Sequence, residues 1–333
     1  MATAQDHSLG LVAEGTYKTF VAPTRFLEFK DVSIDWNKEV AQGEGLRVGS
    51  RVARAARRVV PAASGGGDFT VEAISKGLGL VWQACLGTGA STLVSGSTYQ
   101  QVFTLGDTPP SLTVQEGVVQ AGGTVDAYSF TGCMVTDWEL SIAQNEIAEL
   151  KVSIDAGDLS TAQAYATPSY PSGPNLFHFG SATLTTGTLT APTTTALASS
   201  ITSTANVRGF SVSVNNNLTL DRFNVGGAGR KSKPTVGLRE ISGSMDIEYD
   251  STTYRDLVIN DNTLTGVVIT LTGGALSTGV ETLQVVLPAI KLDGELPKPD
   301  GTDLVVASVS FTGYDDGVNQ PIWVVTRTAD ATL

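Results

Sequence analysis

The sequence has few of the residues with which proteins bind metals, cross-link their chains or catalyse reactions. Its 333 residues include two cysteines, Cys85 and Cys133, and two histidines, His7 and His178. No P-loop, HExxH or paired CxxC motif is present, so the sequence predicts no catalytic cluster, no metal site and no cofactor site. The two cysteines form no disulfide framework and no signal-peptide pattern is seen, which favours a chain made and kept in a reducing cytosol.

Charge and long apolar runs are also scarce. Charged residues make up 16% of the chain, and no segment approaches the roughly 18 consecutive apolar residues of a membrane span. The net charge of −12 argues against a surface that grips nucleic acid, which requires clustered lysine and arginine. Glycine, threonine, serine and valine are plentiful instead, a composition typical of strands and tight turns.

Four aspartates and one histidine are the candidate ligands of the sequence. Asp300, Asp303, Asp315 and Asp316 lie in or beside predicted turns, but their spacing lacks the pattern of an EF-hand calcium loop. Turns favour aspartate in any protein, so a solvated turn is the preferred interpretation, and a hydrolase or lyase is a remote alternative. No second histidine or cysteine lies near His178 in the sequence, which favours a surface or packed histidine over a ligand.

The most informative pattern is an order of elements that occurs twice, in residues 26–157 and 207–315. Each part is predicted to begin with a strand (26–40 and 210–223), followed by a basic glycine-containing loop, a second strand and a short helix. Alternating strands then close each part, at 128–157 and 282–313. A duplicated β unit without catalytic residues predicts a mainly β protein that builds a regular, symmetric assembly.

The two short helices support the duplication because they fall at the same place in both parts. Apolar side chains at helical spacing form one face of each helix, and Gly87 follows the first helix as a stop signal. These faces comprise Leu78, Val81, Trp82 and Cys85 in the first helix and Tyr254, Leu257 and Val258 in the second. The residues at 250–251, Asp and Ser, are predicted to cap the second helix.

The duplication divides the chain into four parts. They are an N-terminal arm (1–24), a first repeat (25–158), a Thr/Ser-rich connector (159–206) and a second repeat (207–333). The arm is polar and is expected to be ordered only where it docks on something. Within the connector, a strand is predicted only at residues 175–184, and residues 185–206 show little charge or periodicity.

Two basic loops contrast with the acidic remainder. Residues 42–67 hold five arginines against Glu44, a net +4, and end in a glycine run at 64–67 that predicts a flexible return. Residues 224–239 hold four cations and no acid, again +4, so the rest of the chain carries about −20. The cations are Arg47, Arg51, Arg54, Arg57 and Arg58 in the first loop and Arg230, Lys231, Lys233 and Arg239 in the second. The favoured interpretation is a contact arm that lands on the acidic body of a neighbouring copy, with a solvated loop and a nucleic-acid contact as alternatives.

Several motifs occur in a specific order along the chain. GTYKTF (15–20) precedes the first strand, and LRVGSR (46–51) lies in the first basic loop. The later motifs are YSFTGCMVTDWELSIAQNEIAELKVSID (128–155), ISGSMDIEY (241–249), YRDLVI (254–259) and LPAIKLDGELPKPDGTDLVVASVSFTGYDD (287–316). In this combination, which covers most of the chain apart from the connector, the sequence resembles the tail tube (major tail) proteins of siphophages, bacteriophages with long non-contractile tails.

The resemblance implies both a fold and a function. Such proteins fold as two packed β-sheets with a short helix, form six-membered rings whose sheets join into a β-barrel, and stack these rings into a tube. The long loop, here 42–67 and 224–239, reaches the adjacent ring. Genomic DNA passes through without specific binding, and tape-measure and tail terminator proteins are the expected partners. Because this chain carries two units, three chains are expected to close a pseudo-sixfold ring of the virion tail, assembled in the host cytoplasm.

An acidic body suits such a channel, because a lumen of like charge lets DNA slide without sticking. Candidate lumen-facing acids alternate with packed positions, although a one-residue slip of register would reverse their face. They are Glu146, Glu149, Asp155, Asp246 and Glu248. The alternative function is a tandem β-sandwich adhesin or a virion decoration protein, which predicts independent, flexibly linked domains.

Overall fold

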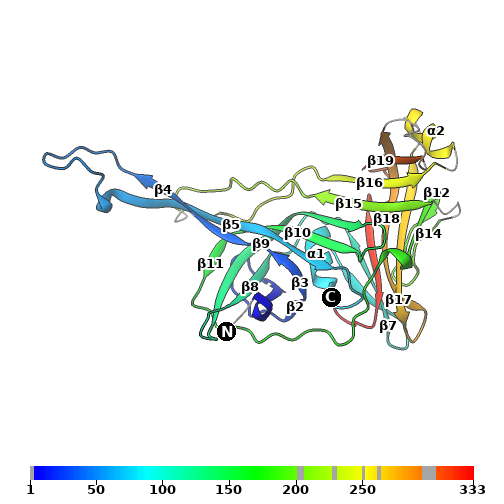
Figure 1. Cartoon of the computed structure of the whole chain (residues 1–333), viewed down its shortest axis with the longest axis horizontal. Helices are drawn as coiled ribbons and strands as arrows, with labels where there is room; N and C mark the ends of the chain where they lie inside the picture. Colours follow the sequence, from blue (N-terminus) through cyan, green and yellow to red (C-terminus); the bar gives the residue numbers. More distant parts are fainter. Residues whose placement is uncertain (1–3, 201–205, 227–230, 250–251, 261–263, 295–304) are drawn as a thin grey trace.

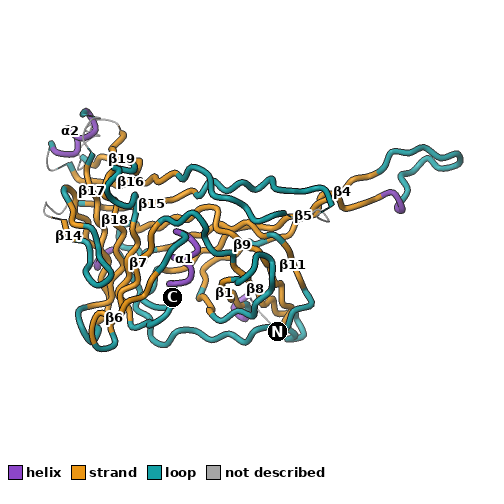
Figure 2. Tube along the Cα trace, turned by 180° about the vertical axis from the view of Figure 1, so that it is seen from behind, coloured by secondary structure: helices purple, strands orange, loops and turns teal. Residues whose placement is uncertain are grey.

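The protein is mainly β, which confirms the predicted fold class (Figure 1). The structure, a computed structural model, describes residues 4–200, 206–226, 231–249, 252–260, 264–294 and 305–333. Most strands belong to one large antiparallel sheet system, and one long hairpin projects from the body. Figure 2 shows the same arrangement from behind, with one short helix inside the body and another at its far end.

A central sheet runs through both halves of the chain. Its strands are β3 (Phe29–Val32) and β4 (Asp35–Gln42), then β5 (Arg58–Glu72), β10 (Glu149–Ala156), β9 (Val125–Ile142), β15 (Val207–Asn215), β16 (Glu240–Glu248), β19 (Val306–Gly313) and β18 (Val280–Gly294). The pair β9–β15 joins the two halves. Side chains alternate between two faces: Leu150, Val152 and Ile154 of β10 are buried, while Glu149 and Lys151 belong to the opposite face.

The longest strand of each half, β9 in the first and β18 in the second, extends beyond the central sheet and pairs there with further strands. These further strands are β1 (Ser8–Ala13), β2 (Arg25–Leu27), β6 (Ala90–Ser95), β7 (Thr98–Thr104), β8 (Leu112–Val119), β11 (Asp158–Ser160), β12 (Ala182–Gly187), β17 (Thr265–Ala275) and β20 (Trp323–Thr328). β9 pairs with β8 and β11, and β8 continues into β1 and β2. β18 pairs with β17 and β20, which continue into β12 and into β7 and β6. A separate small sheet consists of β13 (Leu189–Thr190) and β14 (Ser199–Ser200).

One large hydrophobic core connects the two halves. It contains Leu9 and Leu140 from the first half together with Val212 and Phe311 from the second. The pairing of β15 with β9 brings these side chains under the same sheet. The boundary between the predicted repeats is therefore not a boundary of the core.

The two helices lie where the sequence predicts them. α1 (Gly79–Leu86) is almost entirely buried, and Trp82 meets Trp138 edge-on with ring centroids 5.3 Å apart. Gly87 ends this helix with φ 102°, a conformation that favours glycine. α2 (Thr253–Ile259) is the second helix, and its predicted cap at 250–251 lies outside the described residues.

The N-terminal arm predicted over residues 1–24 docks on the body through the strand β1, which the sequence pattern does not predict. Leu9 and Leu11 are fully buried, and β1 pairs with both β2 and β8. The loop that follows is held by the Glu14 carboxylate, which accepts a hydrogen bond from the backbone N–H of Gly132 (2.8 Å). A pair of leucines separated by a glycine is too short a pattern to distinguish a strand from a loop.

The predicted connector also contributes structure to the body. The strand expected at 175–184 begins only at Ala182, because η3 (Phe179–Ser181) is a 3-10 turn. β12 then pairs with β17 and adds an edge strand to the second half. Residues 201–205 of the connector lie outside the described part of the chain.

Candidate functional site

The first basic loop forms the end of a long hairpin, β4–β5, that projects from the body (Figures 1 and 2). Pairing continues as far as Gln42 and Arg58, and the chain turns between them. The predicted loop over 42–67 is therefore wrong in its second part, which belongs to β5. The glycine run serves close approach rather than flexibility, because a Cβ at Gly67 would collide with the carbonyl oxygen of Ser33.

The tip of this hairpin presents apolar side chains together with arginines. Leu46 and Val48 are 100% and 101% exposed, and Val52 is 81% exposed. Arg47 and Arg51 are exposed beside them. A cluster of solvated aliphatic side chains mixed with guanidinium groups is typical of a surface that another protein covers.

The other arginines of the first loop shape the hairpin end. Arg57 accepts a hydrogen bond on its carbonyl oxygen from the backbone N–H of Gly43 (2.9 Å), and its guanidinium group lies against Gly45, where a Cβ would require the guanidinium group to move. Gln42 Nε2 donates to the carbonyl oxygen of Arg54 (3.2 Å). Arg58 is exposed at the start of β5.

The second basic loop runs along the body towards the base of the hairpin (Figures 1 and 2). Within it, Lys231 is 5% exposed and forms an ion pair with Asp155 of β10, which is 6% exposed. The ammonium group also lies 5.9 Å from the ring centroid of Phe223. Lys231 and Asp155 are thus buried together inside one chain. The predictions that Lys231 is a contact residue and that Asp155 lines a lumen are therefore wrong.

Lys231 stabilises the charged form of the buried Asp155 carboxyl group. Burial raises the pKa of Asp155, and the ammonium group of Lys231 opposes that rise. The other carboxylate oxygen of Asp155, Oδ2, has no hydrogen-bond partner among the residues that the structure describes. Without Lys231, the fold would hold a buried carboxylate with no ion-pair partner.

Arg239 and the backbone of Lys233 also form hydrogen bonds within the chain. Arg239 donates from Nε to Asn216 Oδ1 (2.8 Å) and from Nη2 to a backbone carbonyl oxygen, and burial lowers its pKa. Lys233 is half-buried, and its carbonyl oxygen accepts a hydrogen bond from Arg222. Arg230, which was predicted as a contact residue, lies outside the described residues.

Three of the candidate lumen acids lie on the face of the central sheet that points away from the core. Glu149 forms an ion pair with Lys30, and Glu248 forms one with Arg208 (Nε to Oε1 2.8 Å). Asp246 is exposed on β16, and the residues before and after it are buried. The strand alternation therefore places these three carboxylates on one common surface, the polar face.

The polar face is lined by serines and by more carboxylates than cations. Ser211 and Ser213 of β15 meet Ser244 and Ser242 of β16, each with hydroxyl oxygens 3.0 Å apart. Its carboxylates include Asp68, Glu72, Asp137, Glu139, Glu149, Asp246, Glu248 and Asp293, and its cations include Lys30, Lys151, Arg208 and Lys291. Glu146, the remaining candidate, is exposed in the turn between β9 and β10.

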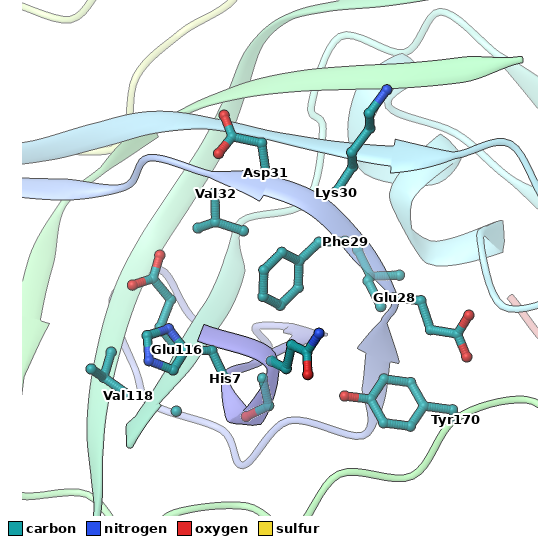
Figure 3. Close-up of a pocket in the computed structure, with 13 residues that line it drawn as sticks. His7, Glu28, Phe29, Lys30, Asp31, Val32, Glu116, Val118 and Tyr170 are labelled. Atoms are coloured by element: carbon teal, nitrogen blue, oxygen red, sulfur yellow. The ribbon is translucent and has the colours of Figure 1, made fainter. Parts of the chain in front are cut away.

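A cavity of 560 Å³ lies between η1 (Ala4–Asp6), β3 and β8 (Figure 3). Figure 3 shows His7 and Glu116 at one side of it, Tyr170 at the other and Phe29 between them. Burial raises the pKa of Glu116 to about 7, and its Oε1 atom has no hydrogen-bond partner in the described part of the chain. Sequence reasoning missed this cavity because its walls come from segments that are far apart along the chain.

The described aspartates considered as calcium ligands and the two cysteines lie in a turn and in the protein interior, respectively. Asp316 Oδ1 accepts hydrogen bonds from two backbone N–H groups that follow it, as in a turn, while Asp300 and Asp303 lie outside the described residues. Cys85 and Cys133 are buried, and burial raises the pKa of both thiols. Where side chains are described, no three metal-ligating groups come together, and no described helix is both long and apolar enough to cross a membrane.

The sequence matches a protein family over nearly its whole length. A family model described as phage tail tube protein matches residues 4–313. The matched span includes both halves of the central sheet, both basic loops and the connector. No curated protein matches the sequence.

Proposed function

Because the chain belongs to the phage tail tube protein family, we propose that its copies join into rings and that these rings stack into the tail tube of a long-tailed phage. In this proposal the tube is a passive channel through which the genome leaves the virion. The protein acts through its contacts with other copies and has no catalytic role.

The observation that carries this proposal is a pair of open sheet edges. β4 pairs with β5 on one side, and no described strand lies on its other side. At the opposite end of the central sheet, residues 291–294 of β18 pair with β19 and have no described strand beyond them. Open antiparallel edges extend readily by pairing with another chain. Copies joined edge to edge would continue the sheet, and closure into a ring would leave no edge open.

The strand pairing supports a ring of three chains with pseudo-sixfold symmetry. In the first half β5, β10 and β9 lie side by side, and in the second half β16, β19 and β18 do the same. β8 pairs with β9 as β17 pairs with β18. Each half would supply one similar unit, so three chains would supply the six units of a ring.

The polar face is the surface that suits a channel wall. Its opposite face covers the hydrophobic core, so closure of the sheet around a channel would turn the serines and carboxylates inward. An excess of carboxylates repels the phosphates of DNA, and small hydroxyl side chains leave a smooth wall. Glu149, Asp246 and Glu248 are the candidate lumen residues that this arrangement retains.

The projecting hairpin is suited to join one ring to the next. Its apolar and basic tip would meet the acidic remainder of a neighbouring copy, where opposite charges favour association. A tape-measure protein inside the tube and a terminator at its end are the further partners in this proposal. The place of the protein would be the virion tail, after assembly in the host cytoplasm.

The alternative function, an adhesin or decoration protein, requires independent and flexibly linked domains. In this chain β15 pairs with β9 from Phe210 to Asn215, and the two halves share one core. These contacts favour a rigid assembly subunit over a string of binding modules.

Electron microscopy of the purified chain tests the proposal. Rings with threefold or pseudo-sixfold symmetry, and tubes built from them, are expected at high protein concentration or after assembly partners are added. A compact monomer under all of these conditions would overturn it.

A further inference from the structure

We propose that Asn37 in β4 of one copy pairs with Asp293 in β18 of the next copy, in the register with which Asn215 pairs with Asp137 inside each chain. This inference rests on the proposed ring and adds the register of the joint between its chains. Each open edge is thus filled by a second copy of this chain, and the joint within the chain serves as the template.

The template is the joint that β9 makes with its two neighbours. On one edge β10 places Ser153 opposite Asp137. On the other edge β15 places Asn215 opposite the same aspartate, and the pairing continues to Phe210 opposite Ile142. The position of Asp137 therefore defines how the opening strand of the second half lies against the first half.

β18 repeats the first part of this arrangement. β19 places Ser310 opposite Asp293, as β10 places Ser153 opposite Asp137. Both serine hydroxyls donate a hydrogen bond to the aspartate, to Oδ1 in the first half (2.8 Å) and to the carbonyl oxygen in the second (3.0 Å). The surrounding sequences agree as well, KVSIDAGD at 151–158 and SVSFTGYD at 308–315. Asp293 thus occupies the place of Asp137, with the edge beyond it open among the described strands.

β4 supplies the strand that would fill this edge. β15 lies on β16 with Asn215 opposite Glu240, and β4 lies on β5 with Asn37 opposite Ser64. In both partner strands a glycine follows three positions later: Gly67 after Ser64 in β5, and Gly243 after Glu240 in β16.

The next strand along confirms that these positions correspond. Phe69 of β5 lies opposite Val152 of β10, and Met245 of β16 lies opposite Val309 of β19. Phe69 follows Ser64 at the same interval as Met245 follows Glu240, and both valines precede the serines that pair with the two aspartates. Asn37 therefore takes the place in the first half that Asn215 takes in the second.

The two edges are complementary in this register. Antiparallel pairing of Asn37 with Asp293 places Glu39 opposite Lys291, so that an acid faces a cation on the same side of the sheet. It also places Trp36 opposite Gly294, which offers space for the large indole. The Asn37 amide is a donor for the Asp293 carboxylate, and both residues are exposed in the single chain.

Cysteine cross-linking of assembled full-length chains tests this register. Asn37→Cys with Asp293→Cys places two Cβ atoms about 5 Å apart, a separation that a small adjustment brings within disulfide reach. The matched control, Asp35→Cys with Asp293→Cys, keeps the same face of β4 but lies two residues out of register. The native Cys85 and Cys133 are buried and do not compete. Each variant is oxidised in the assembled state and separated on a denaturing gel without reductant, and its melting temperature is compared with that of the unmodified chain.

The expected result is a ladder of linked dimers and trimers from Asn37→Cys/Asp293→Cys, and unlinked chains from the control. Rings in the microscope together with linking of the control pair, or with linking of neither pair, would overturn the register and leave the proposed tube intact. Failure of the unmodified chain to form rings would instead overturn the proposed function.

A charge exchange provides a second test that does not depend on disulfide geometry. Glu39→Lys and Lys291→Glu alone should each weaken ring formation, because like charges then face each other across the joint. The double variant should restore it. Equal ring formation in both single variants and in the unmodified chain would contradict the register.

Discussion

The two basic loops have the same net charge in the sequence, but their cations lie in different surroundings. Arg47 and Arg51 of the first loop are exposed at the tip of a projecting hairpin. In the second loop, Lys231 is buried against Asp155, and Arg239 donates hydrogen bonds within its own chain. The comparison shows that charge counted along a loop does not measure the charge available to a partner.

This difference gives the loops different roles in the proposed tube. A hairpin with an exposed tip can reach a neighbouring ring, whereas the contacts of Lys231 and Arg239 hold the second half of the chain against the first. Asn216, directly after β15 and before the second loop, is buried, accepts a hydrogen bond from Arg239 of that loop, and donates from Nδ2 to the carbonyl oxygens of Cys85 and Val135 (3.2 and 3.0 Å). We therefore expect contact between rings to depend mainly on the first loop, and the stability of the chain mainly on the second.

The largest effect is expected when the tip of the first hairpin is removed. Replacement of residues 45–54 by a two-residue Asn-Gly turn keeps β4 and β5 connected but deletes the exposed apolar and basic side chains. Rings should still form and the melting temperature should stay the same, while tubes should disappear from electron micrographs.

The matched change in the second loop is the control for this experiment. Residues 224–229 are replaced by the same turn, and tubes are expected to persist because the paired cations that follow are left in place. Loss of tubes in both variants would remove the distinction between the loops, and loss only in the second would reverse it.

The next largest effect is expected from Lys231→Met in the second loop. This change leaves the buried Asp155 carboxylate without its ion-pair partner, which lowers the free energy of unfolding by about 3–5 kcal/mol. Urea unfolding of the unassembled chain, followed by tryptophan fluorescence, measures the loss.

A double variant separates the ion pair from simple packing. Lys231→Met combined with Asp155→Leu should recover most of the lost stability, because replacing both charges by apolar groups leaves no carboxylate to bury. A single variant that loses less than about 1 kcal/mol would show that other contacts hold the second loop to the body.

Local patterns predicted the elements of this fold well and their contacts poorly. The helical spacing of Leu78, Val81, Trp82 and Cys85 and the glycine stop predict α1 almost to the residue. These signals succeed because a helix and its termination are specified by neighbours in sequence. The family resemblance succeeds for a related reason, since the order of motifs survives in the order of strands.

The misassigned residues depend on partners that are distant along the chain. Lys231 lies 76 positions from Asp155, and neither residue carries a local sign that the other will bury it. The glycines at 65–67 have the composition of a flexible linker, but they permit β5 to pass close to the backbone segments on both sides of it. Charge and glycine content describe what a segment can do alone, whereas tertiary packing decides which of these possibilities is realised.

A third, smaller effect is expected from Glu116, a buried carboxyl group that, unlike Asp155, has no described cation of the second loop beside it. Its titration should change the stability of the fold with pH. Burial raises the pKa of Glu116 from 4.5 to about 7, so between these values the folded chain keeps a proton that the unfolded chain releases. The free energy of unfolding should therefore fall as the pH rises through this range, by at most about 3 kcal/mol.

The comparison of Glu116→Gln with the unmodified chain isolates this contribution from other titrating groups. The glutamine variant should show a flatter dependence of unfolding free energy on pH between pH 5 and pH 7.5. Identical slopes would mean that the carboxyl group is ionised in the folded chain, and that a buried acid in this protein does not require a cation such as Lys231.

The smallest effects are expected from single arginines, one in each loop. Arg239→Ala removes the donors to Asn216 Oδ1 and to a backbone carbonyl oxygen, which should lower the free energy of unfolding by about 1–3 kcal/mol. Arg51→Ala, at the exposed hairpin tip, should change it by less than about 0.5 kcal/mol. The order should reverse for assembly: Arg51→Ala weakens stacking and reduces its sensitivity to salt, and Arg239→Ala leaves the salt dependence unchanged. Thermal unfolding of the unassembled chain and light scattering of tubes at low and high salt measure the two effects. If both variants changed stability and stacking to the same extent, the two loops would not differ in function despite the difference in the burial of their cations.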